Sequence, residues 1–112
     1  LSFTLFLNSP EEYEGGELII EDGIGGRAIK LAAGDLVLYP SYSIHRVEPV
    51  TQGRRLACFS WLESLVQAPQ QRSLLHELDM TILDLRSEHG DNEQSVRLTN
   101  CYHNLMRMWA ST

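Results

Sequence analysis

Short apolar runs separated by glycine, proline and polar residues fill the first half of the chain. The runs lie at residues 2–7, 17–21, 27–31, 36–39, 45–49 and 54–61. Between them we predict a polar loop at residues 11–16 and a Thr-Gln-Gly turn at residues 51–53. Runs this short and this regularly interrupted predict antiparallel strands. They favour a sandwich or a jelly-roll barrel over a parallel sheet with intervening helices.

From Pro69 onward the apolar spacing changes to that of an α-helix. One predicted stripe comprises Leu74, Leu75, Leu78, Ile82 and Leu85, and a second comprises Leu98, Tyr102, Leu105, Met106 and Trp109. A polar break at residues 87–92 separates the helices, and Asp91 followed by Gln94 indicates a capping box. We therefore expect a mainly β fold followed by two C-terminal α-helices. Residues 1–65 would form the sheet region and residues 66–112 a helical tail packed on the sheet.

Composition narrows the classes of function. The 112 residues suffice for one domain or a part of one. Nine basic residues against fifteen acidic ones give a net charge of −6, which removes the electrostatic basis for binding nucleic acid. No apolar run approaches the ~20 residues needed to cross a bilayer, so we expect no membrane partner.

The two cysteines carry information about the compartment. Cys58 and Cys101 lie far apart in the chain and lack the close spacing of a metal or redox motif. We expect both to be small buried thiols rather than a disulfide. Unpaired thiols indicate a reducing compartment, and the expected location is the cytoplasm.

Candidate chemistry centres on His45 and Arg55. We predict that they lie on two successive strands joined by the Thr-Gln-Gly turn, facing one cavity, while Arg54 points the other way because strand side chains alternate. Neutral imidazole is a good ligand for ferrous iron, and guanidinium is a two-pronged clamp for a carboxylate. Together they suit a site for iron and 2-oxoglutarate. Each alone is more often structural, as a core or surface histidine or an exposed strand arginine.

Several further segments carry a resemblance to a known family. They are residues 1–7, 13–18, 33–41, 45–47 and 49–51, Gly53, and residues 102–105. With these segments the chain resembles the C-terminal half of a PKHD-type hydroxylase, a bacterial relative of prolyl 4-hydroxylase among the Fe(II)- and 2-oxoglutarate-dependent dioxygenases. The segments extend over nearly the whole chain, so the match is specific.

The resemblance implies a double-stranded β-helix, or jelly roll, with a small helical tail. It maps the distal iron ligand onto His45 and the arginine that binds 2-oxoglutarate onto Arg55. Tyr39 is a candidate to hydrogen-bond the cosubstrate, with a packed strand tyrosine as the alternative. The implied cofactors are Fe(II) and 2-oxoglutarate, with L-ascorbate as an optional addition. The implied reaction hydroxylates an unidentified substrate and releases succinate and CO2.

The family takes its other two iron ligands from an H-x-D motif on an earlier strand. The letters occur here at His89-Gly90-Asp91, between the two predicted helices and downstream of His45. The chain order of the family does not place the motif there. Because the chain opens inside a strand-like run, we expect the missing ligands among residues that precede Leu1.

Two classes of function stay open. The leading one is an oxygenase that acts on a small molecule or a peptide. The alternative is a non-catalytic cupin-type module that binds a small anion or a metal through the same His45 and Arg55. An H-x-D motif upstream in the parent reading frame would separate the two, and assembly into a homo-oligomer is compatible with both.

Overall fold

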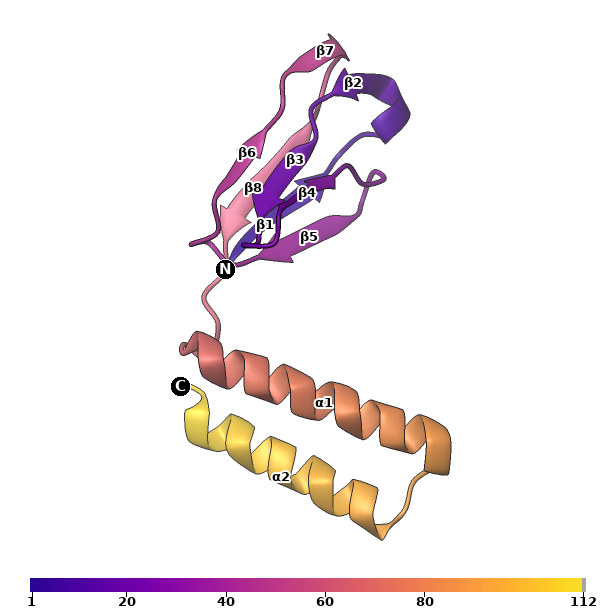
Figure 1. Ribbon diagram of the computed structural model, residues 1–112, viewed down its shortest axis with the longest axis vertical. Helices are drawn as coiled ribbons and strands as arrows, with labels where there is room; N and C mark the ends of the chain where they lie inside the picture. The colour runs from indigo at the N-terminus through magenta and orange to yellow at the C-terminus, as the bar shows by residue number, and fades with distance from the viewer. Residues whose placement is uncertain (112) are drawn as a thin grey trace. The chain divides into compact units, whose positions relative to one another are not determined.

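The computed structural model of the chain describes residues 1–111 and contains two compact units (Figure 1). The first unit, Leu1–Leu62, holds all the named strands, and the second begins at Glu63 and holds both α-helices. Eight strands in antiparallel sheets followed by two helices confirm the expected fold class. The packing of the helices on the sheet stays a prediction.

The first unit contains two three-stranded sheets and a two-stranded ribbon, all antiparallel. One sheet has the order β5-β1-β8, the other β4-β3-β6, and β2 pairs with β7. A 3-10 turn, η1, at Pro10–Glu12 leads into β2. The strands are β1 (Ser2–Phe6), β2 (Tyr13–Gly15), β3 (Leu18–Glu21), β4 (Gly26–Ile29), β5 (Leu36–Tyr39), β6 (His45–Val47), β7 (Val50–Gly53) and β8 (Ala57–Trp61).

The β2–β7 ribbon differs from the sequence-based expectation. The segments predicted as a polar loop and a Thr-Gln-Gly turn pair with each other over the register Tyr13↔Gly53 and Glu14↔Gln52. Neither segment alternates between apolar and polar residues, so nothing local marked them as strands. The predicted strand at residues 54–61 also begins later, at Ala57.

The core of the first unit joins its two three-stranded sheets. Leu18 and Ile20 alternate with less buried neighbours along β3 and cluster with Tyr39 of β5. Ile29 and Val37 pack against this cluster. Because cross-strand partners share a face, the pairing of Leu18 with Val47 and Ile20 with His45 places both β6 side chains on the face of this cluster, where they remain exposed.

The cysteine prediction is correct in one respect and wrong in another. Both thiols are free, but the side chains of Cys58 and Cys101 are exposed rather than buried. Cys58 lies on β8 opposite Leu5, one position out of phase with the pairing of Phe59 to the buried Thr4. Strand alternation therefore directs Cys58 to the outer face.

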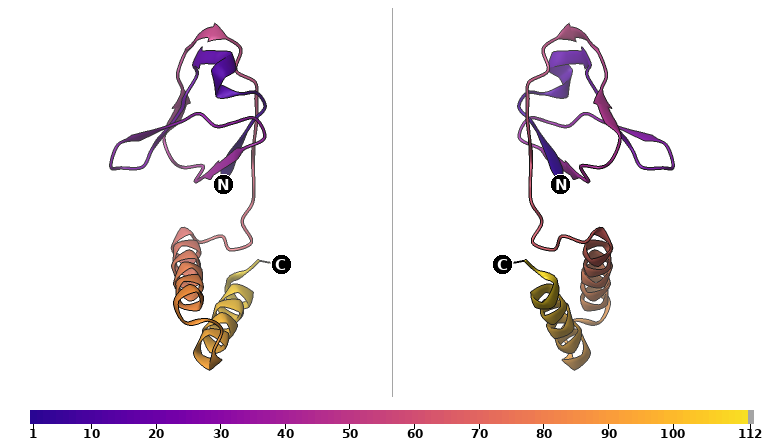
Figure 2. Two further views of the ribbon diagram at one scale, coloured as in Figure 1. Left: turned by 90° about the vertical axis from the view of Figure 1, so that its right-hand side faces the viewer. Right: turned by 90° about the vertical axis from the view of Figure 1, so that its left-hand side faces the viewer.

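The second unit is a helical hairpin. Helix α1 spans Pro69–His89 and α2 spans Glu93–Trp109, and they lie side by side and antiparallel in every view (Figures 1 and 2). Leu75 and Ile82 of the predicted apolar stripe are the buried residues of α1. Pro69 lies in the first turn, where a missing N–H costs no helical hydrogen bond.

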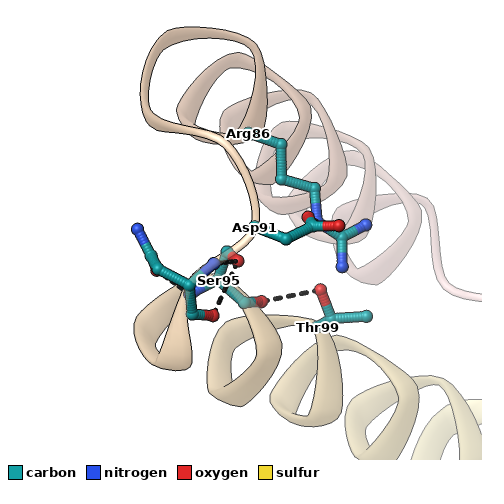
Figure 3. A network of polar contacts seen from close by, with 5 residues as sticks. Arg86, Asp91, Ser95 and Thr99 are labelled. Carbon is teal, nitrogen blue, oxygen red and sulfur yellow. Dashed lines mark hydrogen bonds and ion pairs between the residues drawn. The ribbon is translucent and has the colours of Figure 1, made fainter.

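The cap of α2 lies one residue beyond the predicted one. Asn92 is the N-cap: its side chain accepts a hydrogen bond from the Ser95 N–H at 2.8 Å, and the Asn92 N–H donates to Ser95 Oγ at 3.0 Å. The Thr99 hydroxyl then donates to the Ser95 carbonyl at 2.8 Å (Figure 3). Asp91, the predicted cap, instead forms an ion pair with Arg86 Nε at 3.0 Å. The extended backbone at Asn92 decides which polar residue caps the helix.

Replacing Asn92 by alanine is expected to lower the free energy of unfolding by about 1 kcal/mol, because the buried Ser95 amide loses its acceptor. Asp91→Ala is the control, since its exposed ion pair contributes roughly 0–1 kcal/mol. Chemical denaturation of both variants measures the difference. If Asp91→Ala lowered the free energy of unfolding more than Asn92→Ala, Asp91 would be the cap instead.

Candidate functional site

A cavity of about 230 Å³ lies between the two three-stranded sheets. The side chains that line it come from five strands and from the link after β7: Thr4, Leu18, Tyr39, His45, Val47, Arg55 and Phe59. It contains every residue that the sequence assigned to the site. A wider surface hollow of about 830 Å³ lies against the Pro40–Ile44 loop but contains neither His45 nor Arg55, so the smaller cavity is the candidate site.

His45 presents one ring nitrogen that is suited to a metal. Its Nδ1 lies 2.8 Å from the Ser43 carbonyl oxygen. A carbonyl can only accept, so this contact requires the proton on Nδ1 and leaves a lone pair on Nε2. Metal-binding histidines have this arrangement, because the hydrogen bond at one nitrogen fixes the tautomer and the ring orientation.

Tyr39 fixes the histidine from the opposite sheet. Its ring centroid lies 5.1 Å from that of His45, with the planes inclined at 65°. Tyr39 is buried, lines the cavity and pairs with Ser2 in the β5–β1 ladder. The tyrosine therefore limits how far the imidazole can tilt. Its predicted hydrogen bond to a cosubstrate stays a prediction.

Arg55 is half-buried and provides one buried donor, its Nε, without a protein partner in the described part of the chain. Its Nε is buried and has no hydrogen-bond partner within residues 1–111. The guanidinium carbon lies 5.6 Å from the centroid of the Phe6 ring, a cation–π distance. Leaving a buried donor unpaired costs about 1–3 kcal/mol, and more when it is charged. An anion bound in this cavity would satisfy the Arg55 donor.

A second arginine, Arg46, already forms ion pairs with acidic side chains. It faces outward from β6 and forms ion pairs with Glu21 at 3.2 Å and Glu48 at 3.0 Å. The hydrogen bond to Glu21, followed by the one to Glu48, raises the pKa of the Arg46 guanidinium above its ordinary value. Arg55 is therefore the arginine that is available to a carboxylate in the cavity.

The predicted route that joins His45 to Arg55 is wrong, although both residues line the same cavity. His45 is on β6, which pairs with β3, and β7 lies between β6 and Arg55 and pairs with β2. Arg55 lies in residues 54–56, an irregular link between β7 and β8. The two residues meet across the sheets, not across a hairpin.

Gly16 provides the space for the Arg55 side chain. It is buried at φ +69°, and a Cβ there would lie 3.0 Å from both the Tyr13 ring and the Val50 side chain and 3.2 Å from Arg55 Cδ. Positive φ is available to glycine without steric cost. The Gly-Gly pair thus allows the arginine stem to approach the β2–β7 ribbon.

Replacing Gly16 by alanine is expected to destabilise the protein by about 1–3 kcal/mol, through backbone strain and overpacking, and to displace the Arg55 stem. Gly34→Ala is the matched control, because Gly34 also has positive φ (+91°) but nothing lies within 4 Å of its Cβ position. Chemical denaturation of both variants measures the difference. Equal losses of stability would contradict the steric role of Gly16.

Sequence reasoning missed Thr4 and Phe59, which line the cavity from β1 and β8. Their backbones are paired in the β1–β8 register, so both side chains face the cavity side of the sheet. Thr4 is buried on β1, as is the other polar residue of that strand, Ser2. A polar residue at an inward position of a predicted strand was the signal that could have identified it.

Among residues 1–111, the cavity has one histidine, His45, and not the complete ligand set of a metal site. Within residues 1–111 no three His, Cys, Asp or Glu side chains lie close enough to hold a metal ion. His89 and Asp91, which match the letters of H-x-D, lie in the helical unit, where Asp91 pairs with Arg86. In the same residues, neither helix combines the length and apolar character needed to cross a membrane.

Two family models cover most of the chain. Residues 1–63 match the 2OG-Fe(II) oxygenase superfamily, and residues 70–111 match the PKHD-type hydroxylase C-terminal domain. The first region contains the cavity with His45 and Arg55, and the second contains both helices.

Curated relatives agree with these matches over the whole chain. Proteins named PKHD-type hydroxylase from Polaromonas sp. strain JS666 and Saccharophagus degradans are each 56% identical over 112 residues, and one from Nitrosomonas europaea is 54% identical. Each alignment covers 100% of this chain but 49–50% of the relative. The chain thus spans about half the length of the curated relatives it matches.

The expected jelly-roll fold follows from the superfamily match together with the eight antiparallel strands. Membership of this superfamily implies Fe(II) and 2-oxoglutarate as cofactors. The chain belongs to the 2OG-Fe(II) oxygenase superfamily and, within it, to the PKHD-type hydroxylases.

Proposed function

We propose that the complete protein is an Fe(II)- and 2-oxoglutarate-dependent dioxygenase that hydroxylates a small molecule or a peptide and releases succinate and CO2. The observation that carries the proposal is the buried, unpaired Arg55 Nε in the same cavity as His45. In this proposal Arg55 binds the distal carboxylate of 2-oxoglutarate and His45 provides one iron ligand.

The cavity suits the cosubstrate in charge and in polarity. A guanidinium with an unused donor binds a carboxylate through charge-assisted hydrogen bonds. Buried Leu18, with the more exposed Val47 and Phe59, gives the cavity a partly apolar lining. Tyr39 and Thr4 supply hydroxyl groups on the same lining, and we propose Tyr39 as a further hydrogen-bond donor to the cosubstrate.

His45 can be one ligand of Fe(II), but an iron site needs further ligands. His45 Nε2 can donate its lone pair to Fe(II), because Nδ1 is occupied by the Ser43 carbonyl. A facial triad requires a second histidine and a carboxylate, which we propose come from an H-x-D motif in the part of the protein outside this chain. When bound, iron and 2-oxoglutarate supply the oxidising chemistry, while the protein positions the cosubstrate and excludes water.

Further properties of the complete protein extend the proposal. We propose a cytoplasmic location, supported by the two free thiols, and L-ascorbate as an accessory reductant. The acidic net charge supports a partner other than nucleic acid. Assembly into a homo-oligomer is compatible with the exposed apolar side chains of the sheet unit, such as Phe59 and Trp61.

The alternative is a cupin-type module that binds a small anion or metal without catalysis. Among the described residues the cavity has a single histidine, and this favours the module, because one ligand does not hold Fe(II) in a redox site. Calorimetric titration of the complete protein with 2-oxoglutarate, with and without Fe(II), paired with succinate measurement, separates the two. Binding that depends on Fe(II) together with succinate release supports the dioxygenase, whereas binding without turnover supports the module.

A further inference from the structure

The segment that carries Arg55 is not held by a regular strand. The β1–β8 ladder ends at the pair Phe6↔Ala57, and residues 54–56 lie beyond it. One backbone hydrogen bond continues the ladder, from the Leu7 N–H to the Leu56 carbonyl at 3.0 Å. Regular pairing therefore does not determine the direction of the Arg55 side chain.

The Asn8 side chain replaces the backbone hydrogen bonds that the β1–β8 ladder lacks at residues 54–56. Its Nδ2 donates to the Arg54 carbonyl at 2.7 Å, and its Oδ1 accepts from the Leu56 N–H at 3.0 Å. A carboxamide has both a donor and an acceptor, as a neighbouring strand backbone does. The two bonds hold the peptide groups on either side of Arg55.

We propose that Asn8 is a positioning residue for the cosubstrate arginine. Its carboxamide fixes the backbone on both sides of Arg55 and so directs the side chain toward the cavity, with the stem in the space above Gly16 and the guanidinium over the Phe6 ring. The inference rests on the proposed role of Arg55 in binding 2-oxoglutarate. It also explains why exposed Arg54 and half-buried Arg55 point apart without strand alternation.

The position of Asn8 separates this role from a general structural one. The groups it binds lie on exposed or half-buried residues, so water can replace the amide when it is removed. Removing the Asn8 amide is therefore expected to affect mainly the orientation of Arg55. Since 2-oxoglutarate contacts this arginine in its bound and reacting states alike, the loss is expected in cosubstrate affinity and not in the maximal rate.

The test uses the complete protein loaded with Fe(II) under anaerobic conditions, with 2-oxoglutarate binding measured by calorimetry. Asn8→Ala is expected to raise the Kd for 2-oxoglutarate by about five- to tenfold, equivalent to one or two weakened hydrogen bonds. With oxygen present, kcat at saturating cosubstrate should change by less than about twofold. Asn8→Ser is a second variant that keeps a polar side chain but is too short to reach both peptide groups, and it should also raise the Kd.

Asn92→Ala is the matched control, because it removes another asparagine side chain that hydrogen-bonds the backbone, here at the Ser95 N–H in the helical unit. It should lower stability and leave the Kd unchanged. An equal rise in Kd for Asn92→Ala would mean that the effect follows general destabilisation, and the inference would be overturned.

A double variant tests whether Asn8 acts through Arg55. In the Arg55→Leu background, Asn8→Ala should change the Kd by less than about twofold, because the group it positions is gone. A further rise as large as that of the single variant would overturn the inference. If Arg55→Leu alone binds 2-oxoglutarate normally, the proposed function of Arg55 fails instead.

Trypsin tests the positioning independently of any ligand. It cleaves after Arg54 and Arg55, so Asn8→Ala should be cut there faster than the unmodified protein and than Asn92→Ala. Unchanged cleavage would show that Asn8 does not hold this segment, whatever the cosubstrate experiments give.

Discussion

Replacing His45 by alanine is expected to abolish 2-oxoglutarate-dependent succinate formation by the complete protein and to remove its stoichiometric Fe(II). His45 lines the cavity and has Nε2 free to bind a metal, because Nδ1 is held by the Ser43 carbonyl, and its ring packs against Tyr39. Loss of a partner outside the ligand set already lowers metal affinity by about 10–100-fold, so loss of a ligand should cost more. Iron content after desalting and succinate formation measure the two effects.

His89→Ala is the control for the His45 variant. His89 is exposed at the end of α1 and is the first residue of His89-Gly90-Asp91, which has the sequence pattern H-x-D. His89 is not among the residues that line the cavity. Iron content and turnover should therefore match the unmodified protein. Normal iron content in His45→Ala, or loss of iron in His89→Ala, would contradict the assignment of His45.

Replacing Arg55 by lysine is expected to raise the apparent KM for 2-oxoglutarate by about ten- to hundredfold. The substitution keeps the charge but removes the planar pair of donors, and a lost charge-assisted hydrogen bond is worth about 1.5–3 kcal/mol. Arg55→Leu should have the larger effect, because the carboxylate would then enter an apolar cavity without a cationic partner. Succinate formation titrated against 2-oxoglutarate measures both variants.

Arg54→Leu is the control for the arginine series. Its side chain is exposed, whereas its carbonyl, which accepts from Asn8, is retained in the variant. An exposed substitution of this kind changes a free energy by about 0.5 kcal/mol, so the KM should stay within about twofold. If Arg54→Leu is impaired and Arg55→Leu is silent, the arginine that binds the cosubstrate is Arg54.

The local sequence was sufficient to predict most elements and the inward direction of His45. The short apolar runs at residues 2–7 and 36–39 and the helical spacing from Pro69 onward correspond to β1, β5 and α1. Such patterns record which face of an element is buried, so a sequence can reveal them without knowledge of the partner. His45 and Val47 share a face for the same reason, because they are two residues apart on one strand.

Contacts between distant segments decided most of the rest. The pairing of β2 with β7 and the direction of Arg55 had no local periodic signal. The choice of Asn92 over Asp91 as the cap depended on the backbone conformation at the start of α2. Arg55 faces the cavity because Asn8, far earlier in the chain, binds its neighbours and Gly16 leaves space for its stem. A hydrogen bond between remote backbone groups depends on where the folded chain brings them, and residue periodicity carries no record of that. Sequence therefore determined which residues could perform the chemistry, and tertiary structure decided how the arginine reaches the cavity.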